Sequence, residues 1–290
     1  MARTVVITGG TGGLGLATAK RLAARGDRVV VVGRDRGRGE RAVAELAEVY
    51  ASHGSGRAEL VLADFSSLAS VRAAAKEITE RLERIDVLIN NAATSSWGAG
   101  ARSETADGFE LFFASNYLAP YLLTRLLLPR LRGGTPARIV NIGASQMNAR
   151  FDFDDLQLKK SWSEVAAITH AKLGIFCMTR SLAARFSPTE LTSNVLDPGL
   201  VRTDYHAKAG LALRLVLRLA GKPAEQVAKA YEWIASAPEL ASTSGKMFNT
   251  SHQEVPFKGQ AADDAVADRL WRESARLAGL PEEIEAPAPR

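Results

Sequence analysis

The sequence predicts an α/β fold in which one doubly wound parallel sheet lies between two helical layers, a three-layer α/β/α arrangement. Short apolar runs rich in valine and isoleucine alternate with helical stretches from the first residues onward. These runs are apolar at successive positions, as strands buried on both faces are. The 290 residues contain no evident linker, repeat or low-complexity segment. We therefore expect a single domain over residues 1–290.

The first part of the chain contains four short strand patterns with helical patterns between them. In order, we expect strand Thr4–Ile7, helix Gly13–Arg25, strand Arg28–Val32, helix Glu40–Ser52, strand Glu59–Ala63, helix Leu68–Leu82 and strand Asp86–Asn90. Each helix separates two strands, which is the pattern of a crossover between parallel strands.

The second part of the chain continues the alternation and then becomes less regular. We expect a long apolar helix from about Gly108 to Leu131, bent by Pro120. Strand Arg138–Ile142, helix Glu164–Phe186 and strand Thr192–Leu196 follow. The region of about 200–222 is expected to form a substrate loop or lid, and about 250–290 a C-terminal tail with a frayed end. Within that loop, the apolar stretch Leu211–Ala220 could cover a substrate, touch a membrane or pack as an ordinary helix.

Composition limits the classes of function. The net charge of +5 comes from scattered arginines rather than a dense basic block, so we predict no nucleic-acid partner, and an anionic ligand would explain the charge equally well. The single cysteine, Cys177, excludes an internal disulfide framework and fits a reducing compartment. The first apolar run is too short for a signal peptide or a membrane span. We therefore predict a cytoplasmic protein without a transmembrane segment, and we predict no metal site.

A glycine-rich loop joins the first predicted strand to the first predicted helix, with the sequence Thr8-Gly9-Gly10-Thr11-Gly12-Gly13-Leu14-Gly15. Glycine lets the backbone turn tightly and approach a ligand closely. The helix that follows begins with unpaired N–H groups and a partial positive charge, which suits a pyrophosphate. A glycine run alone could be a flexible turn, but its place in the first βα connection favours a dinucleotide site.

Further motifs follow in a fixed order along the chain. Asn90-Asn91-Ala92-Ala93 follows the fourth strand, Asp64 ends the third, Asn116 lies in the long helix, and Asp197-Pro198-Gly199 precedes Thr203. With Thr8-Gly9 and Gly13-Leu14-Gly15, this series resembles the short-chain dehydrogenases/reductases, which have a Rossmann-type fold. The resemblance covers roughly residues 4–203.

The resemblance implies a nicotinamide dinucleotide cofactor. The residues that would bind it are Thr8, Gly9, Thr11, Gly13, Leu14, Gly15, Arg34, Asp64, Phe65, Asn91, Ala92, Ala93, Lys172, Pro198, Gly199 and Thr203. Arg34 stands where NADP-using relatives carry an arginine, and a guanidinium there can pair with the 2′-phosphate. Asp35 follows directly. In NAD-dependent enzymes an acidic side chain near this position usually binds the ribose hydroxyls, so Asp35 keeps NAD(H) open as an alternative cofactor. We favour NADP(H) over NAD(H).

The family uses a serine, a tyrosine and a lysine for proton transfer, and only the lysine has a clear match here. Lys172 fits its position, but Ile168 stands four residues earlier, where the tyrosine is expected. An isoleucine carries no exchangeable proton. Ala144 occupies the usual serine position, and Ser145 follows it. By the same resemblance, Asn116 would support the proton relay.

Other groups could replace the phenol. Thr169 lies about 100° around the helix from Ile168, and its hydroxyl is too weak an acid. His170 has a suitable pKa but lies about 200° around, away from the pocket. Tyr205 and His206 follow the Pro-Gly segment and are the better substitutes if their loop folds inward, although either could be an ordinary loop residue. Asn116, Ser145, Lys172 and Tyr205 are therefore the candidate catalytic residues.

Several segments outside these motifs resemble the retinol-dehydrogenase-type branch of the family. They are Phe153-Asp154-Asp155-Leu156, Leu182-Ala183-Ala184-Arg185-Phe186, Ser244-Gly245-Lys246-Met247-Phe248 and Leu270-Trp271. That branch acts on lipophilic carbonyls and alcohols with NADP(H), which implies a small apolar metabolite as substrate. Trp97 and Trp162 would suit an apolar pocket, or equally ordinary packing.

Three functions remain open. The first is an atypical NADP(H)-dependent oxidoreductase. The second is an enzyme on the same scaffold that performs a cyclisation, dehydration or isomerisation, with the nucleotide structural or absent. The third is a nucleotide-binding pseudoenzyme. Relatives pair through the helices that correspond to Gly108–Leu131 and Glu164–Phe186, so a homodimer or homotetramer is also expected.

Overall fold

The computed structural model describes residues 2–53, 55–94, 100–133, 136–144, 150–202 and 220–284. Within them, seven parallel strands form one sheet in the order β3-β2-β1-β4-β5-β6-β9. The strands are β1 Thr4–Thr8, β2 Arg28–Gly33, β3 Ala58–Leu62, β4 Val87–Asn90, β5 Ala137–Ile142, β6 Leu191–Asp197 and β9 Met247–Asn249. Two short strands, β7 Val201–Arg202 and β8 Lys222–Pro223, pair separately.

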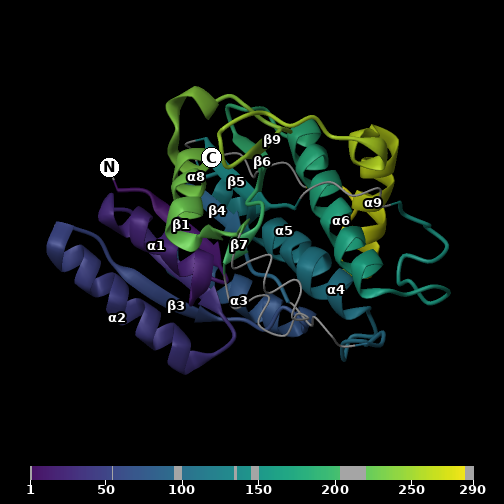
Figure 1. Cartoon of the computed structure of the whole chain (residues 1–290), viewed down its shortest axis with the longest axis horizontal. Coiled ribbons are helices and arrows are strands. Elements are labelled where there is room, and N and C mark those ends of the chain that lie inside the picture. Colours follow the sequence, from purple (N-terminus) through teal and green to yellow (C-terminus); the bar gives the residue numbers. More distant parts are fainter. Residues whose placement is uncertain are drawn as a thin grey trace.

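Helices cover both faces of the sheet. On one side lie α1 Gly13–Ala24, α2 Arg36–His53 and α8 Ala224–Ser236, and on the other lie α3 Leu68–Arg81, α5 Ala119–Leu131 and α6 Glu164–Arg185 (Figure 1). Successive side chains of β1 enter different cores: Val6 packs with the second group of helices, whereas Val5 and Ile7 pack with the first. This arrangement confirms the predicted three-layer α/β/α fold.

The long predicted helix is interrupted. It consists of α4 Leu111–Phe113, a π-helical turn over Ala114–Leu118 and then α5. Gly108 has a positive φ of 81°, and the Glu110 side chain caps the helix by accepting from the Phe113 N–H, so the helix begins at Leu111 rather than Gly108. In a regular helix the Pro120 ring would clash with the Asn116 carbonyl, and the wider π turn directly before it relieves that clash.

Helix α2 begins one turn earlier than predicted. The Arg38 N–H donates to Asp35 Oδ1 at 2.7 Å, so Asp35 acts as the cap of the first turn. Gly37 and Gly39 are weak helix formers, and their presence hid this first turn in the sequence. The Asp35 carboxylate, which kept NAD(H) open as an alternative cofactor, therefore accepts a hydrogen bond from the backbone of the helix that it caps.

The C-terminal region is more ordered than predicted. It contains two 3₁₀ turns (Pro238–Leu240 and Gly259–Ala262), strand β9 and α9 Asp264–Leu277. Trp271 of α9 is 1% exposed, and its ring packs edge-on against Tyr121 with the centroids 4.9 Å apart. Residues of β9 and α9 belong to the core, and the predicted frayed end lies beyond the described residues.

Helix α9 packs against α6 (Figure 1), and its Trp271 also contacts Tyr121 of α5. The Ser181 hydroxyl donates to the Ala267 carbonyl at 3.0 Å, and the Tyr121 hydroxyl donates to the Trp271 carbonyl at 3.0 Å. The predicted pairing of two copies through α5 and α6 stays a prediction, and such a pairing would have to accommodate α9.

One stretch in the described part of the chain, Leu111–Leu131, is long and apolar enough to cross a membrane by length and composition alone. In its most apolar window, 83% of the residues are buried inside the fold. A central helix of a protein core has the same properties, so this stretch is weak evidence for a membrane span.

Candidate functional site

The predicted site residues that the structure describes gather at the carboxyl ends of the central strands. Thr8 ends β1, Asn91 follows β4, Ala144 follows β5 by two residues, and Pro198 follows β6. Ligands of open parallel sheets bind at this edge, where the strand order reverses between β1 and β4.

The glycine loop between β1 and α1 has no room for side chains at two of its positions. Gly9 has a φ of +68°, and a Cβ on Gly15 would overlap the Gly9 carbonyl oxygen. Gly12, the residue before α1, contributes no side-chain cap to the helix. The first N–H groups of α1 therefore face the loop without a side-chain acceptor, which suits a pyrophosphate.

Thr8 and Asn91 hold this loop to the end of β4. The Thr8 hydroxyl oxygen accepts from the N–H groups of Asn91 at 3.0 Å and Ala92 at 2.9 Å. In return, Asn91 Nδ2 donates to the Thr8 carbonyl at 2.8 Å and to the Gly9 carbonyl at 3.4 Å. These reciprocal bonds fix the distance between the two predicted cofactor motifs.

Tyr231 is a residue of this site that the sequence did not reveal. It lies on α8, and its hydroxyl donates to Asn91 Oδ1 at 3.3 Å. Because 140 residues separate the two, no local pattern in the sequence connects them.

The adenosine side of the predicted site carries charge of both signs. Arg34 is exposed just beyond β2. Burial raises the pKa of Asp64, but hydrogen bonds from Ser66 and the charge of Arg34 outweigh it, and the net pKa is lowered. Asp64 is thus a carboxylate with Arg34 as its nearby counter-charge. Phe65, which follows it, is buried in the core.

Asn116 lies in the π-helical turn, where its amide is engaged at both ends. Its Oδ1 accepts from the Thr94 N–H at 2.6 Å, and its Nδ2 donates to the Thr94 carbonyl at 3.1 Å. The side chain thereby ties the π turn to the segment that follows Asn91. The predicted relay through Asn116 stays a prediction.

Lys172 lies on α6, and its Nζ donates to the Ile142 carbonyl at 2.8 Å, at the end of β5. Burial lowers the pKa of Lys172 to about 8, while the charge of Asp197 acts in the opposite direction. Ile168 lies one helical turn earlier on the same face and is partly exposed. The predicted site therefore has an apolar side chain beside its ammonium group.

The neighbours of Ile168 on α6 are engaged elsewhere. The Thr169 hydroxyl lies 2.8 Å from the Val165 carbonyl and 3.1 Å from that of Ala166, so it donates within its own helix. His170 is buried against Phe151, with ring centroids 4.4 Å apart. Burial lowers the pKa of His170 to about 4, so the ring is neutral near pH 7. This packing agrees with the expected direction of His170 away from the pocket.

Several predicted residues lie outside the described part of the chain. They are Trp97, Ser145, Thr203, Tyr205, His206 and most of the stretch 211–220.

Gly199 is described, with a φ of +64° and its N–H donating to Asp197 Oδ1 at 2.8 Å. Trp162 donates to Glu110 Oε1 at 3.1 Å, which favours its packing role. The described residues contain no cluster of three or more His, Cys, Asp or Glu side chains suited to a metal ion.

Comparison with known protein families gives one match that covers most of the chain. The family model described as short chain dehydrogenase matches residues 3–214. This range contains the glycine loop, Asn91, Asn116, Lys172 and the Pro-Gly segment.

Individual relatives extend the likeness to almost the whole chain. Retinol dehydrogenase 13 of Homo sapiens is 36% identical over 99% of this chain and 88% of its own length. Polyprenol dehydrogenase of Mus musculus is 37% identical over 96% of this chain and 84% of its own length. The crystal structure of an uncharacterized protein from Mycobacterium paratuberculosis has a TM-score of 0.77 and 28% identity, covering 98% of this chain and 95% of its own. These likenesses agree with the predicted retinol-dehydrogenase-type branch.

Proposed function

Because this chain belongs to the short-chain dehydrogenase family, we propose that it is an NADP(H)-dependent oxidoreductase that acts on a small apolar carbonyl or alcohol. Its relatives are dehydrogenases, which supports oxidoreduction as the general class. The choice of NADP(H) and the nature of the substrate depend on the side chains discussed below.

The observation that carries the proposal is the basic start of α2. Arg34 is exposed beyond β2, and Asp35 is occupied in capping the helix rather than free for a ribose hydroxyl. Arg36 and Arg38 stand in the first turn, which holds no acid. Positively charged side chains at a helix N-terminus destabilise the helix, because its dipole already places partial positive charge there. A bound anion would offset this repulsion. This charge pattern favours a nucleotide with an additional 2′-phosphate.

The residues of the glycine loop and its neighbours fit the rest of such a nucleotide. A Cβ on Gly9 or Gly15 would meet Asn91 Nδ2 at 2.9 Å or 2.7 Å, so the loop keeps its close-packed shape only with glycine at these positions. Asp64 and Asn91 would lie on the adenosine side of the nucleotide. Lys172 would hold the nicotinamide ribose through its ammonium group. When bound, the nicotinamide supplies or accepts the hydride. The proton would come from Ser145, from Tyr205, or from a water relayed through Asn116.

Apolar side chains support a lipophilic substrate. Ala144 and Ile168 present no hydroxyl at the positions where the family carries serine and tyrosine. Val165, three residues before Ile168, is 50% exposed, and Leu200, directly after the Pro-Gly segment, is 46% exposed. The relatives named as retinol and polyprenol dehydrogenases act on apolar alcohols by their names, and we extend that class to this chain.

Ala144 and Ile168 also favour a second candidate function. A chain that binds the nucleotide without these hydroxyls could use the pocket for a non-redox step, or for nucleotide binding alone. Tight NADPH binding with no oxidation or reduction across a panel of apolar ketones and alcohols would support this second candidate.

The proposal also includes the cellular location, the oligomeric state and the class of partner. The single Cys177 supports a reducing, cytoplasmic location. A homodimer or homotetramer is proposed by analogy with the pairing of relatives. The scattered distribution of arginines supports a small metabolite rather than nucleic acid as the partner.

The test is calorimetric titration of the nucleotide-free protein with NADPH and NADH, for the wild type and for Arg34→Gln. A hydrogen bond to a charged group contributes about 1.5–3 kcal/mol, so Arg34→Gln should weaken NADPH binding roughly 10- to 100-fold and leave NADH binding unchanged. Arg272→Gln on α9 is the control, because it removes the same charge from an exposed position on another helix. Equal losses for both nucleotides would refute the 2′-phosphate role, and a wild type that binds neither would refute the proposed function.

A further inference from the structure

Tyr231 reaches the nucleotide site from a helix that belongs to none of the recognised motifs. Its side chain is fully buried in the core between the sheet and the layer of α1 and α8. Burial raises the pKa of Tyr231, and the charge of Asp197 raises it further. The hydroxyl therefore stays protonated and can donate to Asn91 Oδ1, 3.3 Å away.

The amide of Asn91 is packed against the glycine loop on its other side. Its Nδ2 donates to the Thr8 carbonyl at 2.8 Å, and a Cβ on Gly9 or Gly15 would come within 2.9 Å or 2.7 Å of that nitrogen. The loop and the amide thus leave each other no free space. With Oδ1 bonded to Tyr231 and Nδ2 to the loop, both ends of the amide are fixed.

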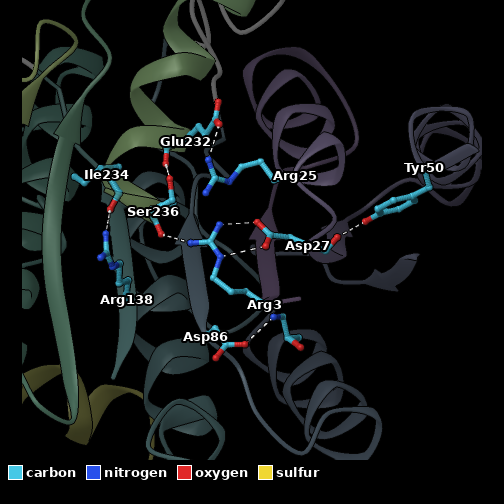
Figure 2. Close-up of polar contacts among 11 residues, drawn as sticks. Arg3, Arg25, Asp27, Tyr50, Asp86, Arg138, Glu232, Ile234 and Ser236 are labelled. Atoms are coloured by element: carbon cyan, nitrogen blue, oxygen red, sulfur yellow. Dashed lines mark hydrogen bonds and ion pairs between the residues drawn. The ribbon is translucent and has the colours of Figure 1, made fainter. Parts of the chain in front are cut away.

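The helix that carries Tyr231 is anchored at its C-terminal end by two arginines. Arg3 Nη1 donates to the Ala235 carbonyl at 2.8 Å, and Arg138 Nη1 donates to the Ile234 carbonyl at 3.3 Å. Figure 2 shows Arg3 between Asp27 and the end of α8, and its Nη2 lies 2.6 Å from Asp27 Oδ2. These bonds satisfy last-turn carbonyls that have no partner within the helix and place positive charge at its negative end.

A second anchor joins α8 to α1. Glu232, the residue after Tyr231, accepts from Arg21 Nε at 2.6 Å and from Arg25 Nη1 at 3.1 Å (Figure 2 draws the bond to Arg25). Arg21 lies in the last turn of α1, the helix that begins at the glycine loop. Helix α8 is therefore held against the same element whose first turn would receive the pyrophosphate.

We propose that Tyr231 is a positioning residue of the nucleotide site: from the anchored helix α8, its hydroxyl orients Asn91, and Asn91 in turn holds the glycine loop in the conformation that accepts the pyrophosphate. This inference rests on the proposed function, since it concerns binding of the same nucleotide. It assigns Tyr231 no contact with the nucleotide itself.

Tyr231→Phe tests the inference, because it removes the hydroxyl and keeps the buried ring. In calorimetric titrations with NADPH, we expect the Kd to rise about fivefold, the equivalent of one ordinary hydrogen bond. The matched control is Tyr50→Phe. Tyr50 lies in the same core, but its hydroxyl donates to the carbonyls of Asp27 and Arg57 on the opposite edge of the sheet. The Tyr50→Phe variant should have a lower free energy of unfolding but an unchanged Kd for NADPH.

Two further measurements separate positioning from general destabilisation. In an Asn91→Ala background, Tyr231→Phe should leave the Kd unchanged, because the hydroxyl then has no amide to orient. In the nucleotide-free protein, the backbone amides of Asn91 and Ala92 should exchange faster in Tyr231→Phe than in Tyr50→Phe.

The outcomes are distinguishable. A wild type that binds neither nucleotide overturns the proposed function and this inference with it. A wild type that binds NADPH, with equal Kd values in Tyr231→Phe and wild type, overturns only the inference. So does a loss in Tyr231→Phe that persists fully in the Asn91→Ala background or is matched by Tyr50→Phe.

Discussion

The nucleotide half of the site and the catalytic half are built in different ways. Around β1 and β4, backbone groups and two short side chains, Thr8 and Asn91, hold the loop in place with reciprocal hydrogen bonds. Around β5 and α6, the family's chemistry depends on individual side chains, and by our proposal Ala144 and Ile168 stand at two of the three positions. Only Lys172 offers a titratable group among the three.

The difference teaches that binding and chemistry are separable on this scaffold. A cradle made of backbone N–H groups and close-packed glycines keeps its shape whatever side chains stand on α6. Proton transfer, in contrast, needs a donor of suitable pKa at one point, and a single apolar residue removes it. The following predictions test how far the two halves are independent of each other.

The largest expected effect on nucleotide binding comes from Gly15→Ala. The added Cβ would overlap the Gly9 carbonyl oxygen, a backbone atom that cannot move without the whole loop. We expect NADPH affinity to fall by roughly 100-fold or more, measured by calorimetry, with the fold retained by circular dichroism. Gly12→Ala is the control, since its backbone is extended (φ −179°) and a Cβ there meets nothing within 4 Å. Equal binding by the two variants would contradict this account of the loop.

Ile168→Tyr should restore proton transfer in the catalytic half of the site. A phenol one turn before Lys172 would provide a proton donor whose pKa the ammonium lowers, and a general acid typically contributes about 10²–10⁴-fold in rate. Reduction of apolar test ketones with NADPH should rise accordingly. Ile168→Phe supplies the ring without the hydroxyl and should give no gain. Activity that rises equally in both variants would point to packing rather than proton transfer.

The pH dependence of binding should report the lysine that the two halves share. The pKa of Lys172 lies near 8, so its ammonium is charged below that pH and neutral above it. NADPH affinity should therefore be constant from about pH 6.5 to 7.5 and fall about tenfold toward pH 9. Lys172→Met should bind more weakly and lose this decline. A wild-type profile that stays flat to pH 9 would contradict the combination of a lowered Lys172 pKa and a contact between its ammonium group and the nucleotide.

The smallest effect is expected at the start of α6. The Ser163 side chain caps this helix by accepting from the Ala166 N–H at 3.1 Å. Ser163→Ala should lower the free energy of unfolding by about 1 kcal/mol and the Tm by roughly 2 °C, without changing the Kd for NADPH. Ser161→Ala, at an exposed neighbouring position, is the control. A change in nucleotide affinity would show that the two halves are coupled after all.

The sequence by itself determined the layered fold and the position of the nucleotide motifs. Runs such as Val29–Val32 predict central strands, because successive side chains of a strand point to opposite faces and all of these side chains are apolar. Both faces of such a strand are therefore expected to be buried, as they are in the structure. The order of strands and helices then places Thr8, Asn91 and Pro198 at one edge of the sheet. Lys172 and Ile168 could also be placed together, because a spacing of four residues defines one face of a helix.

Only the tertiary structure decided which distant segments support these motifs. It brought Tyr231 to Asn91, Arg3 to the end of α8, and Trp271 of α9 onto α5. The physical reason is that periodicity and spacing report the direction of a side chain relative to its own strand or helix. They carry no record of which residue, often more than a hundred positions away, occupies the space that it faces.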